Sequence, residues 1–340
     1  MNVNYFFSLI AVVVLFLLAY VGVEVFGLHM VFGVVIPYTA FLLFVGGFIY
    51  RVMDWAKSPV PYRIPTTSGQ QATLPWIKQN KIDNPSTTRG VIARMALEVL
   101  LFRSLFRNTR MQLRDGKLSY KWEIWLWVFA LAFHYAFLVV LIRHLRFFLE
   151  PIPFFVQAVE TVDGFFRVEF FSTIFQVGLP AIYLSGLVLL AAVTFLLLRR
   201  IVNPQMRYIS LASDYFPLFL IIGIAITGVM LRYFTKTDIV GVKELTMGLA
   251  TFHPTIPEGV GGLFYGHLFF VSILLAYFPF SKLMHLGGVF LSPTRNLANN
   301  NRAARHVNPW NYPVPVHTYE EYEDEFREKM IEAGLPVEKE

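Results

Sequence analysis

The sequence predicts an all-α, polytopic membrane protein with six transmembrane helices. Of its 340 residues, 56% are hydrophobic and only 15% are charged, whereas a soluble domain carries about a quarter charged residues. The apolar residues also form long blocks of about 20 residues, the length that a helix needs to cross about 30 Å of hydrocarbon. Because no cysteine is present, disulfides, cysteine-ligated iron–sulfur clusters and a covalently attached c-type haem are excluded.

Six apolar stretches are the expected spans. They cover about residues 5–26, 30–50, 122–148, 174–198, 215–231 and 262–286. The first has no basic segment before it and no small-residue cleavage site after it, so we expect a retained helix rather than a signal peptide. The sixth is expected to run as one helix to about Leu286.

The distribution of Lys and Arg predicts the orientation. Of these 29 residues, 23 fall in the segment 51–121, the loop 199–213 and the tail from Lys282 onward, all on one side of the membrane. By the positive-inside rule that side is the cytoplasm, so both termini are expected there, in the cell membrane. The net charge of +6 therefore indicates topology and not nucleic-acid binding.

Four parts follow from this topology: two N-terminal helices (1–50), a basic cytoplasmic insertion (51–121), a four-helix membrane domain (122–290) and a cytoplasmic tail (291–340). Within the insertion, the stretch from Ser86 is typical of a capped amphipathic helix. A second helix is expected in the tail, over 319–333.

Four histidines lie in or at the ends of two spans: His134 and His144 on the third, His267 and His285 on the sixth. A polar ring in hydrocarbon is costly to leave unpaired, so a functional role is the first interpretation, with a helix–helix hydrogen bond as the alternative. At 1.5 Å per residue the first two lie about 15 Å apart and the last two about 27 Å, on one face of a continuous helix. Since the two spans run in opposite directions, His134 and His285 approach the cytoplasmic side, and His144 and His267 the outer side. This arrangement suits two haems, each held between two imidazoles.

Two imidazoles on one iron leave no open position, so such haems carry electrons and do not activate oxygen. Arg143 and Arg146 near the outer pair, and Lys282 and Arg295 near the inner pair, are candidates for contacts to haem propionates, or else snorkel to the interface. The remaining histidines are expected to be ordinary polar residues, although His253 is a candidate for lining a quinone site: His29, His253, His306 and His317.

These residues resemble the haem b subunit family of respiratory nitrate reductase (the NarI family). The resemblance rests on two histidines ten residues apart, then two eighteen apart that end in Phe278-Pro-Phe-Ser-Lys-Leu-Met-His285, and it covers about residues 120–300. It implies that His134 and His285 bind a proximal haem b and that His144 and His267 bind a distal one. The extra N-terminal span, the basic insertion and the tail from His306 are similar to the DsrM (HmeC) family. These are the cytochrome b-like subunits of the Dsr or Hdr-like menaquinol oxidoreductase complexes of sulfur-metabolising prokaryotes.

The resemblance implies that menaquinol is oxidised near the outer haem. Electrons then reach a cytoplasmic iron–sulfur subunit resembling heterodisulfide reductase (the DsrK or HmeD type). The basic insertion and the tail are candidates for docking that partner; a merely solvated positive face is the alternative. Two related functions stay open: the gamma-type subunit of another quinol-linked reductase such as nitrate reductase, and the same chain working in reverse as a quinone reductase.

Functions from other classes fit less well. A transporter needs carboxylates within the membrane, and the spans hold only Glu24 and Glu123, near helix ends. A membrane metalloprotease needs a His-Glu-x-x-His motif, which is absent. A haem-free membrane anchor does not account for the four histidines.

Overall fold

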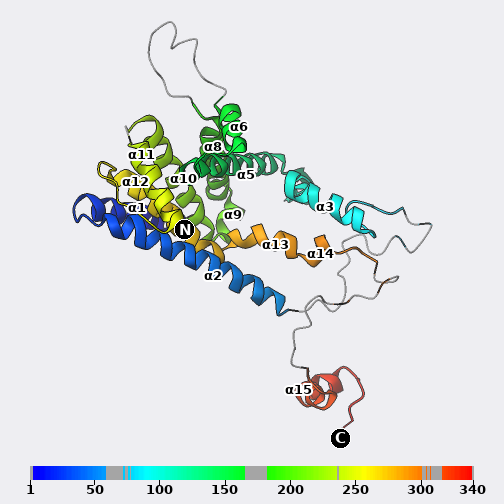
Figure 1. Ribbon diagram of the computed structural model, residues 1–340. Coiled ribbons are helices and arrows are strands. Elements are labelled where there is room, and N and C mark those ends of the chain that lie inside the picture. The colour runs from blue at the N-terminus through cyan, green and yellow to red at the C-terminus, as the bar shows by residue number, and fades with distance from the viewer. Residues whose placement is uncertain are drawn as a thin grey trace.

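The computed structural model describes residues 3–58, 78–164, 182–235, 237–300 and 316–338, together with positions 72, 76, 304 and 307 (Figure 1). Helices dominate this part of the chain, and the predicted all-α polytopic class is confirmed.

Among the described residues, six helical spans are long and apolar enough to cross a membrane. They are α1 (Asn4–Glu24), the π-helix η1 (Val31–Val35) with α2 (Ile36–Ala56), α5 (Ile124–His144) with η3 (Leu145–Phe147), α8 (Leu184–Val202), α10 (Ala212–Tyr233), and α12 (Gly262–Tyr277) with η4 (Phe278–Phe280). Large apolar side chains on their outer faces are exposed, for example Phe7 (61%) and Leu42 (70%), as expected of surfaces that contact lipid. The first part of the predicted fourth span, 174–181, lies outside the described residues.

The transmembrane helices pack side by side in one bundle. Helix α5 packs on α8, α8 on α10 and α10 on α12, while α1 packs on both α10 and α12, and α2 packs on α12 (Figure 1). Helices α5 and α12 are not among the described pairs that pack closely. The two helices that carry three of the four candidate histidines are therefore not packed directly against each other.

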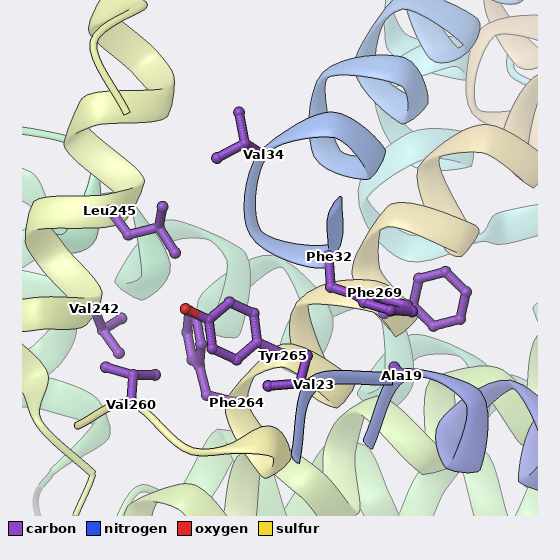
Figure 2. Close-up of a cluster of buried hydrophobic side chains, with 10 residues drawn as sticks. All are labelled: Ala19, Val23, Phe32, Val34, Val242, Leu245, Val260, Phe264, Tyr265 and Phe269. Atoms are coloured by element: carbon purple, nitrogen blue, oxygen red, sulfur yellow. The ribbon is translucent and has the colours of Figure 1, made fainter. Parts of the chain in front are cut away.

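The main core lies where α12 meets the N-terminal helices. Short helix α11 (Ile239–Thr251) closes this core from one side, and Figure 2 shows the core side chains of α1, η1, α11 and α12 converging. Its buried members are Ala19, Val23, Phe32, Val34, Val242, Leu245, Val260, Phe264, Tyr265 and Phe269. This core fixes α12, and with it His267, against α1 and η1. Another short helix, α6 (Phe154–Asp163), packs on α5.

The insertion contains the expected capped helix and also a hairpin. Helix α3 (Thr88–Leu101) begins at Thr87, whose hydroxyl accepts a hydrogen bond from the Gly90 amide. After α4 (Arg103–Phe106), strands β1 (Thr109–Arg114) and β2 (Lys117–Trp122) pair antiparallel. The turn residues Asp115 and Gly116 both have positive φ, as a two-residue hairpin loop requires. This hairpin was not predicted.

Hydrogen bonds tie the insertion to α5. The indole of Trp127 donates to the Leu101 carbonyl at 2.7 Å, and the Tyr135 hydroxyl donates to the Leu100 carbonyl at 3.0 Å. The end of α3 is thereby held beside the first half of α5.

The prediction of one continuous sixth helix is wrong. Helix α12 ends at Tyr277, and after η4 the backbone of Ser281 is extended, at φ −122° and ψ 175°. Pro279 lacks the amide hydrogen that a continuing helix needs, so the helical hydrogen bonding stops there. A short turn η5 (Lys282–Met284) leads into the separate helix α13 (His285–Leu291), so His267 and His285 do not share a helix face.

The remaining elements are short. Helix α9 (Pro204–Ile209) follows α8, and α14 (Pro293–Asn296) packs on α3. In the tail, α15 (Tyr319–Glu332) starts with a capping box formed by Thr318 and Glu321, and agrees with the predicted tail helix.

Candidate haem-binding site

The four membrane histidines meet in two pairs. The ring centres of His134 on α5 and His285 on α13 are 6.0 Å apart, with an interplanar angle of 81°. The ring centres of His144 on α5 and His267 on α12 are 6.4 Å apart, with an interplanar angle of 20°. These are the pairs that the opposed directions of the spans predict. We name them the inner pair and the outer pair, respectively.

Each pair has the spacing of two imidazoles on opposite sides of one metal ion. An imidazole nitrogen binds a metal at about 2 Å and lies about 1 Å from its ring centre, so two such rings have centres roughly 6 Å apart. Both pairs match this value. The residues present therefore fit a haem with two axial histidines at each pair.

Hydrogen bonds assign the same tautomer to three of the rings. The Nδ1 atoms of His134 and His144 lie 2.7 Å from the carbonyl oxygens of Ala130 and Val140, one helical turn earlier. Nδ1 of His285 lies 2.8 Å from the Lys282 carbonyl. A carbonyl can only accept, so each Nδ1 carries the proton. Nε2 is then the unprotonated nitrogen that binds a metal, the arrangement typical of metal-ligating histidines.

The fourth ring, that of His267, is held by Thr227 on α10. The Thr227 hydroxyl lies 2.8 Å from Nδ1 of His267 and donates to the Gly223 carbonyl, also at 2.8 Å. Because its only hydrogen is used there, the hydroxyl oxygen accepts from Nδ1, and Nε2 again stays free. The neighbouring Gly228 lies against the ring, since an added Cβ would be in contact with Cε1 of His267 at 3.4 Å. Sequence reasoning missed both residues.

Two phenylalanines stand edge-on to His134. The ring centre of Phe133 lies 5.0 Å away, and that of Phe102, at the end of α3, lies 4.9 Å away. Phe102 has a left-handed backbone with φ 50°, which a non-glycine residue rarely adopts. The insertion thus contributes a side chain to the surroundings of the inner pair, which the sequence did not reveal.

The cations predicted to contact propionates have protein partners. Arg143 donates to Asp163 at 2.7 Å and to Ser185 at 3.2 Å, while its buried Nε has no hydrogen-bond partner among the described residues. Arg146 pairs with Glu160 at 2.7 Å. One N–H beside the outer pair is thus left for a further acceptor.

The two cations predicted near the inner pair, Lys282 and Arg295, lie outside the membrane-spanning helices. Lys282 pairs with Asp214 at 2.6 Å, and its side chain is 77% exposed. Arg295 lies in α14, next to α3.

The other histidines lie apart from the two pairs. His29 stands edge-on to Tyr265, with ring centres 5.3 Å apart, and the exposed His253 is bonded to the Thr251 carbonyl. His317 is exposed in the tail, and His306 lies outside the described residues.

The fold and these paired histidines define a multi-pass, all-α membrane protein with two sites suited to axially ligated metal. The family model of the nitrate reductase gamma subunit matches residues 90–306, and the chain belongs to that family. It is also similar to two curated proteins, each described as an Hdr-like menaquinol oxidoreductase cytochrome b-like subunit. The protein from Archaeoglobus fulgidus is 48% identical over 82% of this chain and 83% of the relative. The protein from Archaeoglobus profundus is 44% identical over 83% of each. The resemblances to these two groups of proteins, inferred from the sequence, are confirmed.

Proposed function

We propose that this chain is the quinol-oxidising, dihaem cytochrome b subunit of a membrane oxidoreductase complex. The observation that carries the proposal is the pair of imidazole pairs, with ring centres 6.0 and 6.4 Å apart and every Nδ1 engaged by an acceptor. Two haem b groups bound there supply one-electron transfer between the two depths of the bundle. A haem held by two histidines would have no open position for oxygen, so the sites would favour electron transfer over oxygen chemistry.

The protein supplies position and electrostatics to these groups. The backbone carbonyls and Thr227 fix the rings of the four histidines, His134 and His285 for the inner haem and His144 and His267 for the outer one. Arg143, with its unpartnered Nε, and Arg146 are proposed to face the outer propionates. Lys282 and Arg295 are proposed to face the inner ones.

We propose that the inner pair lies toward the cytoplasm, with both termini, the insertion (51–121) and the tail (291–340) on that side. The excess of Lys and Arg on these segments supports this orientation. The relatives' description supports menaquinol as the electron donor, oxidised near the outer pair.

The proposed acceptor is a cytoplasmic iron–sulfur subunit resembling heterodisulfide reductase (DsrK or HmeD type), in a complex of dissimilatory sulfur metabolism. The words "Hdr-like" in the relatives' description support it. The insertion is the proposed docking surface, since Phe102 at the end of α3 contacts His134 and the exposed strand β2 carries Lys117 and Lys121. A nitrate reductase partner is the second candidate, because the matching family model describes that complex's gamma subunit.

A reduced-minus-oxidised absorption spectrum of the purified full-length protein tests the haems. We expect a b-type α band and two haems per chain by haemochrome assay. His144→Ala and His285→Ala are each expected to lose one haem, while the matched variant His253→Ala keeps both, since the His253 ring lies outside the pairs. A colourless wild-type protein, or full haem content in both pair variants, contradicts the proposal.

Reduction of these haems by a menaquinol analogue in membranes tests the donor. Rapid reduction is expected with the quinol alone, and onward oxidation only when the iron–sulfur subunit is present. If dithionite reduces the haems but the quinol does not, the quinol is not the electron donor, although the proposed haem sites still stand.

A further inference from the structure

The hairpin formed by β1 and β2 has one apolar face and one basic face. Its register pairs Met111 with Tyr120 and Leu113 with Leu118, and residues directly opposite each other in an antiparallel pair point to the same side. Because every second residue of a strand shares a side, one face carries Met111, Leu113, Leu118, Tyr120 and Trp122. The intervening positions are polar, and the face that they form carries Arg110, Lys117 and Lys121.

The apolar face of the hairpin is uncovered. Its five large side chains are between 46% exposed, at Trp122, and 74% exposed, at Leu113. No other described helix or strand packs closely on either strand. A two-stranded hairpin alone is only marginally stable in water, and apolar side chains that gather on an exposed face mark a surface for protein or membrane contact. The hairpin therefore needs an apolar surface that the described chain does not supply.

The open end of the hairpin is attached where transmembrane helices end. Strand β2 ends at Trp122, and α5 begins two residues later, at Ile124. On the basic face, Arg110 donates to the side chain of Gln205 in α9 at 3.1 Å, and α9 directly follows α8. These two attachments hold the hairpin at the level of the membrane surface.

The aromatic residues at this level favour lipid over a protein as the covering surface. Tyr120 and Trp122 on β2 and Trp125 at the start of α5 are close together in the chain, and they are 66%, 46% and 65% exposed. Tyr and Trp are enriched at the boundary between membrane and water, where the ring meets apolar chains and its polar tip meets headgroups. The apolar face thus continues along the chain into the surface of α5 that contacts lipid. The long side chains of Lys117 and Lys121 can extend to lipid phosphates and water.

We propose that the hairpin lies flat on the bilayer beside the start of α5, with the side chains of its apolar face inserted between the lipid headgroups. Its basic face then points away from the hydrocarbon. Lys117 and Lys121 stay accessible on that face to the partner proposed above. This arrangement requires neither haem nor quinol.

Single cysteines test the arrangement, because the full-length chain has none that would be labelled as background. Leu118→Cys and Tyr120→Cys place a bimane fluorophore on the apolar face, and the matched variants Ser119→Cys and Lys121→Cys place it on the other face. All four side chains are exposed, so each variant is expected to fold as the wild type does. The labelled proteins are reconstituted in vesicles of phosphatidylcholine and phosphatidylglycerol, in which part of the phosphatidylcholine carries a nitroxide near the glycerol end of its acyl chain.

We expect the nitroxide lipid to quench the fluorophore at positions 118 and 120 several-fold more than at 119 and 121. Iodide in the water is expected to show the opposite preference. Fluorophores on both faces that only iodide quenches would overturn the proposal, because the hairpin would then project into water. Fluorophores at 118 and 120 that neither agent quenches would also overturn it, because a protein surface would then cover the apolar face.

Discussion

Replacement of Thr227 by Val should raise the midpoint potential of one haem and leave the other unchanged. The Thr227 side chain is buried, and its hydroxyl accepts the Nδ1 hydrogen of His267 at 2.8 Å. Val has nearly the same shape without the hydroxyl, so the imidazole loses its acceptor and becomes a poorer electron donor to the metal. One hydrogen bond is worth about 1 kcal/mol, and if all of it acts on the oxidised form the rise is about 40 mV for one electron.

A redox titration followed at the α band, fitted with two components, measures this shift. Thr227→Ser keeps the hydroxyl and should restore the wild-type value. Ser272→Ala is the control, since Ser272 is equally buried on α12 but donates only to the Leu268 carbonyl, at 2.8 Å. An unchanged or lowered potential in Thr227→Val, or the same rise in Ser272→Ala, would refute the assignment of Thr227 as the residue that positions His267.

Three further changes probe the surroundings. Gly228→Val adds a Cβ that would already contact the His267 ring at 3.4 Å, and two methyl groups beyond it. This change should reduce the haem content from two per chain to one by haemochrome assay. Asp163→Asn removes the buried carboxylate that pairs with Arg143 and should cost about 3–5 kcal/mol, seen as a lower melting temperature; an unchanged melting temperature contradicts it. Burial raises the pKa of Asp83, but hydrogen bonds from two arginines outweigh it and the pKa lies below its usual value. Its stabilising effect is therefore present above about pH 4 and is lost as the pH falls through the lowered pKa. Hydrogen exchange of residues 78–106 should show this loss in the wild type and not in Asp83→Asn.

The spans could be predicted because each depends on local composition. A block of about 20 apolar residues has few alternatives to a transmembrane helix, so six spans follow from hydropathy alone. The pairing of His134 with His285 and of His144 with His267 also follows, because consecutive spans alternate in direction. The positions of the spans and the pairing of the histidines can both be predicted from the order of residues along the chain.

Two errors came from signals that the sequence does contain. Pro279, within the apolar block, marks the end of α12, but the high hydropathy around it favoured a continuous helix. Asp115-Gly116 is a strong hairpin signal, but the residues on either side are largely polar, so the two strands were not recognised. In both cases the overall hydropathy of the segment was given more weight than the one or two residues that determine the backbone conformation.

Other site residues leave no local signal. Thr227 is forty positions from His267, and Phe102 reaches His134 only because α3 is tied to α5. Such contacts depend on how helices face each other, which neither hydropathy nor spacing determines.

The two histidine pairs differ in what holds them. The outer pair joins α5, which packs on α8, to α12, which the buried core fixes, so its geometry depends on the membrane bundle. The inner pair joins α5 to the separate helix α13, with Phe102 of the insertion against His134. The break after α12 also frees His285 from the 27 Å spacing of a continuous helix, so its ring can lie beside that of His134. A partner that binds the insertion would therefore act on the inner pair through Phe102 and α5.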